Sequence, residues 1–317
     1  MGQNKWHSSE IWPAETTKNY TLFLNANKDL SQSTPPNESL SYDYDPEDPS
    51  PTIGGKTLTP GIDQGPMDQR FEVENRNDAV VFTSEELTTD MEIQGQVKLK
   101  LFVGSDKKDS DFMARLTEVY DDGRSMLLGE TAVRAHYQNG KSASDTTYLK
   151  KGNVYEYELA FDHLANTFKA GHKIRLIITS SNYPKFNRNM NTGDEMYPNT
   201  NADTLVNPEI ANNSLWFGSQ YPSQLTFPTV NYSPDFISEK PEIQKLKIYP
   251  NPSNGNFQLD KSLIGANVLV YDMKGKLLIE SVKIKSTKLN FTELKSGNYV
   301  IKVQKNGNSF RNKLVIE

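Results

Sequence analysis

The residues of this 317-residue chain that are best suited to chemistry lie in FKAGHKIRLIITSSNYPKFNRNMNTG, residues 168–193. His172 stands ahead of Ser180 and Ser181, and a histidine base beside a serine nucleophile is the pair that serine hydrolases use. The apolar alternation between them predicts a strand, which at roughly 3.3 Å per residue separates His172 from Ser180 by about 26 Å. Hydrogen-bond reach is only about 3 Å, so this stretch does not hold a catalytic pair.

We therefore interpret the two ends of this stretch as structural. Gly171 and His172 close a turn into a core strand. Ser180, Ser181 and Asn182 leave that strand at a corner, where short polar side chains satisfy backbone groups. No catalytic residue is predicted.

Two acidic runs could supply oxygen ligands to calcium. They are Asp43, Asp45, Glu47 and Asp48 in YDYDPEDPS, and Asp109 and Asp111 in KKDSDF. Neither has EF-hand spacing, and carboxylates of this kind commonly cap turns. The remaining histidines lack the H-x-x-x-H and H-E-x-x-H spacings of metal sites: His7, His136 and His163. We predict no metal site and no cofactor.

Aromatic side chains point to a different function. Trp6, Trp12 and Trp216, with fifteen tyrosines, could form a platform that stacks on sugars, and jelly rolls often bind glycans. Aromatic residues equally fill the cores of sandwiches. A secreted or surface carbohydrate-binding or adhesion module therefore stays open as an alternative function.

The elements that must position these residues alternate with period two, and amphipathic helical patterns are nearly absent. QVKLKLFVGS, for example, places Val97, Leu99, Leu101 and Val103 on one face and lysines on the other. Each such strand hides one face, so the sheets must pair face to face. We predict an all-β chain with a jelly-roll β-sandwich over residues 1–236.

Two stretches break this pattern. Residues 33–66 are rich in Pro, Gly, Ser and Asp and predict a long extended loop lying over the sandwich. The polar run SPDFISEKPEIQ, residues 233–244, precedes a new strand, and it predicts a linker at 237–245.

Residues 246–317 predict a second, smaller β unit, an Ig-like sandwich. LKIYPNPSNGNFQL reads as two strands around a Pro-flanked turn, and hairpins are expected at Lys274-Gly275 and Asn306-Gly307. Residues 241–317 carry 13 Lys and Arg against 6 Asp and Glu, whereas residues 1–240 carry 22 against 34. This contrast favours two separately solvated bodies.

Bulk properties exclude several classes of protein. The chain has no cysteine, which excludes disulfides and thiolate chemistry, and it has no apolar run long enough to span a membrane. The basic tail lacks the interleaved aromatic residues of a nucleic-acid platform, so no nucleic-acid partner is expected. The opening MGQNKWHSSEIWP is not a signal peptide.

The tail carries a specific motif. Tyr249, Pro250, Asn251 and Pro252 are followed by Gly255, and then come VYDMKGKLL with Gly275 and LKSGNYVIKV with Gly297 and Tyr299. This series resembles the C-terminal sorting domain of the type IX secretion system of Bacteroidetes. The resemblance implies export across the outer membrane by that machinery, and release or display at the cell surface.

The larger unit also carries ordered motifs. They are MGQNKWHSSEIWP, PEDPSPTIGG, GPMDQRFEVENRNDAVVFTSEEL, DSDFMARLTEVYDDGRSMLL, the stretch at 168–193, and YPSQLTFPTV. Together they resemble the C-terminal jelly roll of the family of X-Pro dipeptidyl-peptidases, cocaine esterases and α-amino-acid ester hydrolases (CocE/NonD). That resemblance implies a Ser-Asp-His triad in an α/β-hydrolase domain upstream, whose active site the jelly roll partly walls.

No G-x-S-x-G elbow and no strand-helix alternation occur here, so we expect this chain alone to lack the triad. We expect it to be the C-terminal part of a longer secreted serine hydrolase, acting on esters, amides or X-Pro peptides, whose hydrolase domain is its partner. By the resemblance, Thr57 and Leu58, just after the Gly-Gly of PTIGG, line the pocket wall.

Overall fold

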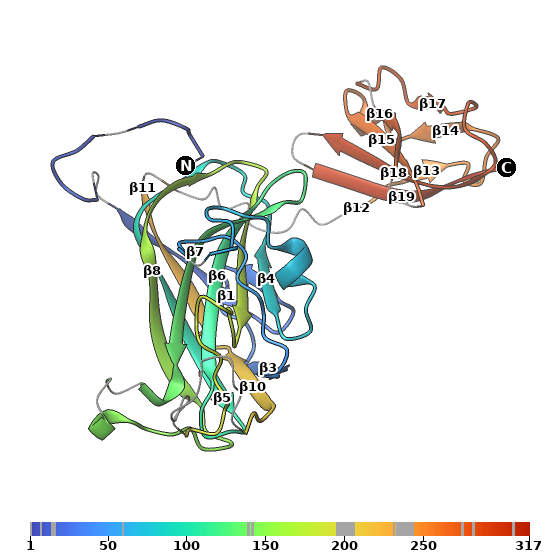
Figure 1. Cartoon of the computed structure of the whole chain (residues 1–317). Coiled ribbons are helices and arrows are strands. Elements are labelled where there is room, and N and C mark those ends of the chain that lie inside the picture. The colour runs from blue at the N-terminus through green and yellow to red at the C-terminus, as the bar shows by residue number, and fades with distance from the viewer. Residues whose placement is uncertain are drawn as a thin grey trace. The chain divides into compact units, whose positions relative to one another are not determined.

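The chain forms two compact units, Met1–Pro234 and Asp235–Glu317, in the computed structural model (Figure 1). The structure describes residues 2–6, 8–13, 17–58, 60–137, 140, 143–194, 207–230, 232, 244–273, 276–280, 283–305 and 308–317. Most of the linker predicted at 237–245 lies outside these residues, as do both expected hairpin turns, at 274–275 and 306–307.

The first unit is built almost entirely of strands. They are β1 (Lys18–Leu24), β2 (Asp29–Ser31), β3 (Glu38–Tyr44), β4 (Val80–Ser84), β5 (Met91–Ser105), β6 (Asp111–Val119), β7 (Ser125–Arg134), β8 (Tyr155–Phe168), β9 (Lys173–Thr179), β10 (Ala211–Phe217) and β11 (Gln224–Val230). Three short helical turns accompany them: η1 (Arg70–Glu74), η2 (Ala135–Tyr137) and η3 (Ala143–Asp145).

The strands form two layers that are joined at a corner. Strands β3, β10, β5, β8, β11 and β1 make one layer, and β4, β9, β6 and β7 make the other. Strand β2 pairs antiparallel with β1 and parallel with β4, so hydrogen bonding continues from one layer to the next. The all-β sandwich predicted from the alternation is confirmed.

Side chains at alternate positions of both layers fill one core. Its members include Val97, Leu99, Leu101 and Val103 of β5, Phe112, Ala114 and Leu116 of β6, Tyr157 and Leu159 of β8, and Ile174, Leu176 and Ile178 of β9. These are the inward positions that period-two alternation predicts. The rings of Phe82 on β4 and Phe217 on β10 meet edge to face across the core, with centroids 5.8 Å apart.

Strand β6 departs from the half-buried pattern because all nine of its residues are buried. Its second face is covered by the segment that precedes η1, to which Arg115 donates a hydrogen bond at the Pro51 carbonyl, 2.9 Å away. Burial lowers the pKa of Arg115 to about 10. This strand therefore lies between the core and a third, irregular layer.

The expectation of one long loop over residues 33–66 was wrong in part. Residues 38–44 form β3, which pairs with β10 over its whole length, because Tyr42 and Tyr44 alternate into the interior. The remaining part does lie over the sandwich: Thr52 and Tyr183 are joined by a 2.8 Å backbone hydrogen bond, and Ser50 donates to the Ser181 hydroxyl at 2.7 Å. The strand was missed because its three alternating apolar residues, Leu40, Tyr42 and Tyr44, stand in a stretch that is otherwise rich in Ser, Asp and Pro.

The second unit has its own core between two small sheets. The larger sheet has the order β12 (Gln244–Lys245), β19 (Asn308–Ile316), β18 (Gly297–Lys305), β15 (Asn267–Asp272) and β16 (Leu277–Glu280). The smaller contains β13 (Ile248–Tyr249), β14 (Asn256–Leu259) and β17 (Lys288–Asn290), and a short turn, η4 (Lys261–Leu263), follows β14. Residues such as Phe257, Val270, Ile301 and Leu314 are buried between them.

Within the described residues, no helix has the length and apolar character needed to cross a membrane.

Candidate functional site

The histidine and serines of residues 168–193 occupy the two ends of β9. His172 Nδ1 lies 2.7 Å from Glu118 Oε1, and its ring stacks on Tyr120. At the other end, the Ser180 hydroxyl lies 2.8 Å from the Tyr42 hydroxyl, and Ser181 accepts the backbone hydrogen bond from Ser50. The structure therefore gives these polar groups separate structural partners at opposite ends of a core strand.

The acidic residues 109 and 111 belong to a buried polar cluster. Asp109 Oδ2 lies 2.7 Å from His136 Nδ1, and Asn189 Nδ2 donates to both Asp109 and Asp111 at 2.7 Å. Arg134 makes two 2.8 Å hydrogen bonds to Asp111. Burial, together with the neighbouring Asp111 charge, raises the pKa of Asp109. The cluster ties the loops at this end of the sandwich to one another.

The acidic run at 43–48 holds turns and neighbouring strands. Asp43 accepts from Asn212 at 2.6 Å, Asp45 accepts the Glu47 amide at 2.9 Å, and Asp48 pairs with Arg76. Across the described ranges, no group of three or more His, Asp or Glu side chains is arranged to hold a metal ion.

The three tryptophans do not form a common platform. Trp6 is fully exposed, Trp12 Nε1 donates to His163 Nδ1 at 3.1 Å, and Trp216 packs edge to face on Tyr221 at 5.4 Å. No ring contact joins two of the tryptophans within the part of the chain that the structure describes. His7 lies outside that part.

The loop that carries Thr57 and Leu58 is closed at its base by glycines. Gly55 and Gly65 exchange two backbone hydrogen bonds, of 2.8 and 3.1 Å, which brings the two ends of the loop together. Gly54 has φ +72°, and a Cβ there would stand 2.5 Å from the Gly65 carbonyl oxygen. Only glycine allows so close an approach. We call residues 55–65 the wall loop.

Gln69 connects the chain segment that enters the wall loop to the segment that leaves it. Its fully buried side-chain amide donates to the carbonyls of Ile53, at 2.8 Å, and Met67, at 3.1 Å. Its backbone N–H donates to the Ser125 carbonyl of β7 at 2.9 Å. The wall loop is therefore attached to the sandwich.

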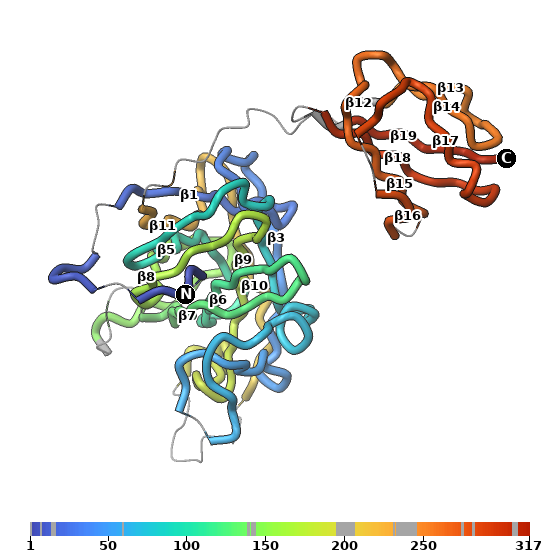
Figure 2. Tube along the Cα trace, turned by 90° about the horizontal axis from the view of Figure 1, so that it is seen from above, coloured from blue at the N-terminus to red at the C-terminus, as the bar shows by residue number. Residues whose placement is uncertain are grey.

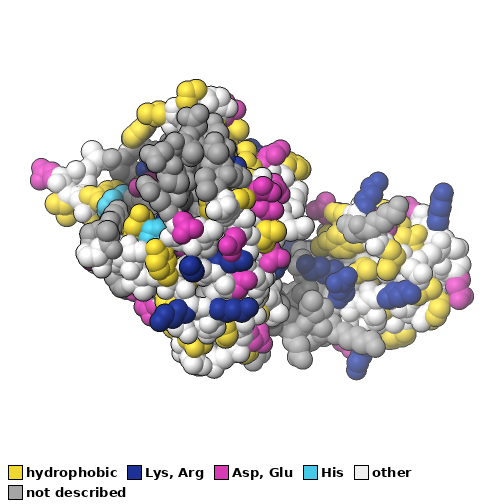
Figure 3. Space-filling model, turned by 60° about the horizontal axis from the view of Figure 1, so that its bottom comes forward, with side chains coloured by type: hydrophobic (Ala, Val, Ile, Leu, Met, Phe, Trp, Pro, Cys, Tyr) yellow, Lys and Arg dark blue, Asp and Glu magenta, His cyan; other side chains and the backbone are white. Residues whose placement is uncertain are grey.

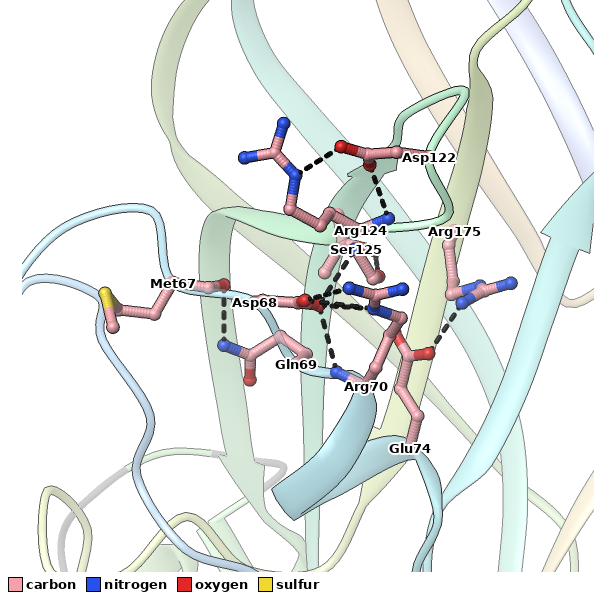
Figure 4. A network of polar contacts seen from close by, with 10 residues as sticks. Met67, Asp68, Gln69, Arg70, Glu74, Asp122, Arg124, Ser125 and Arg175 are labelled. Atoms are coloured by element: carbon pink, nitrogen blue, oxygen red, sulfur yellow. Dashed lines mark hydrogen bonds and ion pairs between the residues drawn. The ribbon is translucent and has the colours of Figure 1, made fainter.

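The neighbouring charged residues reinforce this base (Figure 4). Asp68 accepts hydrogen bonds from the Arg70 guanidinium, at 2.7 Å, and from the Ser125 N–H, at 3.0 Å. Burial raises the pKa of Asp68, but these hydrogen bonds outweigh that effect and hold the pKa below its usual range. On the far side of η1, Arg175 pairs with Glu74.

We predict that Gln69→Leu lowers the free energy of unfolding of the first unit by about 1–3 kcal/mol, because the carbonyls of Ile53 and Met67 lose their donor. Urea denaturation followed by tryptophan fluorescence measures this, since all three tryptophans lie in the first unit. The exposed Gln220 provides the control, and Gln220→Leu should change stability by less than about 0.5 kcal/mol. Equal effects would contradict the role of Gln69.

The wall loop and the residues after it present apolar side chains to solvent. Leu58 is 88% exposed, Phe71 on η1 is 69% exposed, and Met67, which lies between them in the sequence, is also exposed, whereas Thr57 is buried. The Arg70 guanidinium stands 5.1 Å from the centre of the Phe71 ring. We call Leu58, Met67 and Phe71 the apolar face.

A pocket of about 130 Å³ lies behind the wall loop. Gly55 and Gly65 line it on the loop side, and Glu130 of β7 and Lys185 line it on the sandwich side. Glu130 is nearly buried and forms an ion pair with Lys185. Lys56 of the wall loop forms a 3.0 Å ion pair with Asp162 of β8, and both residues line the pocket, so the contacts around it also tie the loop to the sandwich.

The motif residues of the second unit mainly shape its turns. The Asn251 side chain donates to the Lys313 carbonyl at 2.6 Å and accepts from the Val315 N–H at 2.9 Å, between the cis peptide bonds of Pro250 and Pro252. Gly255 has φ +98°, and a Cβ there would stand 2.9 Å from the Thr292 backbone.

Two motif tyrosines are also placed. Tyr299, on β18, donates to the Lys295 carbonyl at 2.6 Å, and Gly297 begins that strand. Tyr249 is exposed. Gly275 lies outside the described residues.

The two units match two known domain families. Residues 1–226 match the X-Pro dipeptidyl-peptidase C-terminal non-catalytic domain, and residues 247–317 match the secretion system C-terminal sorting domain. The class is thus a non-catalytic β-sandwich joined to a secretion signal. The chain belongs to the X-Pro dipeptidyl-peptidase C-terminal domain family of CocE/NonD-type hydrolases, and its sorting domain indicates secretion or cell-surface localisation through the type IX system.

Individual relatives agree with this assignment. The chain is 34% identical to cocaine esterase of Rhodococcus sp. (strain MB1 Bresler) over 240 residues, which are 73% of this chain and 41% of that protein. An aminopeptidase from the marine sediment archaeon Thaumarchaeota archaeon has a TM-score of 0.63 at 22% identity, over 72% of this chain and 39% of that one.

An α-amino acid ester hydrolase has a TM-score of 0.61 at 23% identity, over 72% of this chain and 40% of that one. These two structures show the shared fold. The chain spans about two fifths of the length of each of these three relatives.

Sequence reasoning did not single out Gln69, Met67 or Phe71. All three lie in GPMDQRFEVENRNDAVVF, whose apolar residues follow neither a strand nor a helix pattern. Whether such a side chain is buried or exposed depends on residues distant in the sequence. The paired glycines of PTIGG were the one local signal that the backbone makes a close approach here.

Proposed function

We propose that the whole protein is a secreted serine hydrolase, and that the apolar face of this chain packs against an α/β-hydrolase domain of the same protein. The match of residues 1–226 to a non-catalytic hydrolase domain carries this proposal. A non-catalytic domain of a hydrolase implies a catalytic partner domain. The names of the relatives, an esterase, an ester hydrolase and an aminopeptidase, support substrates that are esters or amides of small acyl groups, or X-Pro peptides.

The chemistry of the apolar face suits an interface between domains. Met, aromatic and Arg side chains are enriched where proteins meet, and here exposed Met67 and Phe71 stand beside Arg70. Exposed apolar area is costly in water, at about 25 cal/mol per Å². Because Gln69 and the two glycines hold the loop base, little conformational entropy would be lost when the face docks.

Within this interface, we propose that Thr57 and Leu58 contribute the pocket wall. Thr57 is buried at the start of the loop, whereas the Leu58 side chain is 88% exposed. A residue that contributes to the pocket of a neighbouring domain is expected to be exposed in this way. Leu58 is therefore the residue expected to contact the acyl group of the substrate, and Thr57 the residue that supports it.

Two measurements test the role of the chain. Coding sequence upstream of Met1 should encode an α/β-hydrolase domain in frame, and the isolated 317-residue chain should not hydrolyse a p-nitrophenyl ester or a Gly-Pro anilide. A stop codon close upstream with no neighbouring hydrolase gene would overturn the proposal. Turnover of either substrate by the isolated chain would overturn it as well.

In the full-length enzyme, Leu58→Trp should lower kcat/KM for long-chain p-nitrophenyl esters about tenfold more than for the acetate, since one methylene in an apolar pocket changes specificity 10–200-fold. Ile210 is an exposed apolar residue of the same unit, so Ile210→Trp is the matched control and should leave the ratio unchanged. A uniform effect on all esters would rule out a role of Leu58 in the acyl pocket.

Glycan binding is the second candidate function. Phe102 on β5 and Trp216 on β10 both pack on Tyr221, at centroid distances of 5.7 and 5.4 Å, and the three rings are partly exposed. Aromatic faces of this kind stack on sugars. A glycan-array signal that is lost in Trp216→Ala would favour this function over that of a hydrolase wall.

A further inference from the structure

Strand β16 is the outer edge of the larger sheet of the second unit. It pairs with β15, which in turn pairs with β18, and Figure 2 shows β16 at the end of this row. Within residues 244–273, 276–280, 283–305 and 308–317, no strand pairs with its outer side. An edge strand leaves backbone N–H and C=O groups free to pair with another chain.

The side chains at the start of this edge are apolar and exposed. Leu277 and Leu278 lie at a β-bulge, because Val270 pairs with Ile279 while Tyr271 pairs with Leu277, and the two leucines are 40% and 39% exposed. Met273, the residue after β15, is 63% exposed. The strand is short, bulged and ends at the exposed Glu280, and these features limit edge pairing. Its two exposed leucines nevertheless form apolar surface that a partner chain would cover.

The residues that flank this edge carry positive charge, and the one acidic residue on β16 itself is Glu280 at its end. Lys276, Lys283 and Lys285 flank β16, are exposed, and form no ion pair with any residue that the structure describes. Figure 3 shows Lys and Arg side chains around exposed hydrophobic side chains on one face of this unit, and residues 241–317 carry 13 Lys and Arg against 6 Asp and Glu. A segment that pairs with β16 would gain from carrying negative charge.

A simpler explanation is that the lysines only prevent aggregation. Charged residues that flank an apolar strand do serve as such gatekeepers. That explanation accounts for the lysines, but it does not account for the exposed leucines, because polar residues at these positions would prevent aggregation better. The two explanations differ in what they expect from secretion, because gatekeepers affect solubility alone.

We propose that β16 is the strand by which the sorting domain is recognised. An extended, acidic segment of the type IX secretion machinery adds to the sheet along β16, and Leu277, Leu278 and Met273 receive its apolar side chains. This inference rests on the sorting function that the family match assigns to residues 247–317. It is independent of the proposed hydrolase.

The test compares opposite charges at one position, in the bacterium that makes the protein. Leu278→Glu should lower the secreted fraction about tenfold, because an apolar contact is lost and like charges meet, whereas Leu278→Lys should lower it less. Ile264, which is 43% exposed elsewhere in the unit, is the control, and Ile264→Glu should be secreted normally. Normal secretion of Leu278→Glu would overturn the proposal, as would equal losses for both variants at position 278.

A second measurement applies even if a variant fails to fold. A photo-crosslinking amino acid at position 278 of the full chain should form adducts with an identified component of the secretion machinery, and the same group at position 264 should not. Adducts only with a second copy of this chain would overturn the proposal. Removal of residues 246–317 tests the sorting function separately, since normal secretion of that variant would contradict the sorting function itself.

Discussion

Replacing Phe82 with alanine is expected to lower the free energy of unfolding of the first unit by about 3–5 kcal/mol. Phe82 is fully buried on β4 and meets Phe217 of β10, in the opposite layer, so the change removes contacts on which both layers depend. The remaining cavity cannot close easily, because its walls belong to hydrogen-bonded sheets. The melting temperature should fall by roughly 10 °C.

Phe71 is the matched control for this substitution. It lies in the same unit but is 69% exposed, so Phe71→Ala should change stability by less than about 0.5 kcal/mol. Tryptophan fluorescence reports on the first unit alone, because the second contains no tryptophan. If Phe71→Ala were as destabilising as Phe82→Ala, the apolar face would belong to the core, and it could not be a free docking surface.

Local alternation was sufficient to predict the inward faces of the strands. Val97 to Val103 and Ile174 to Ile178 are buried at the alternate positions that the pattern marks. The alternation depends only on which face of a strand is buried, so it can be recognised within a few residues of sequence. It therefore predicted the class of fold and the polar corners at both ends of β9 without any knowledge of which strands pair.

The second face of β6 could not be predicted in the same way. Arg115 stands at an outward position, where an arginine ordinarily meets water, yet it is 1% exposed. It is covered by a segment more than 60 residues earlier in the chain, whose carbonyl at Pro51 accepts its hydrogen bond. A covering layer without regular secondary structure has no repeating hydrophobic pattern in its sequence. Its position depends instead on individual contacts such as those of Gln69 and Arg115.

The same limit applies to the candidate site. The resemblance of PTIGG to a known family pointed to Thr57 and Leu58, but it did not show that one is buried and the other projects. That difference arises from the glycine-closed base of the wall loop and from the amide of Gln69. Similarly, the open edge at β16 follows from the order of strands in a sheet, which the hydrophobic pattern of LLIE does not contain.

Gly54→Ala is expected to open the wall loop and to lower the stability of the first unit by about 2–4 kcal/mol. Part of this loss arises because φ is +72° at Gly54, where a side chain costs about 1–2 kcal/mol. The rest arises because the new Cβ would stand 2.5 Å from the Gly65 carbonyl oxygen and 2.7 Å from the Met67 side chain. Both neighbours belong to the closed base.

Gly61 separates these two contributions, because it has φ +83° but no atom within 4 Å of the position that a Cβ would take. Gly61→Ala should therefore show the backbone cost alone, about 1–2 kcal/mol. Limited proteolysis should cut the wall loop faster in Gly54→Ala than in Gly61→Ala, since only the former forces apart the two ends joined by Gly55 and Gly65. Equal stability losses and equal cleavage rates would mean that the contact between the two ends of the wall loop does not hold the loop in place. Leu58 would then lack a fixed position from which to shape a substrate pocket.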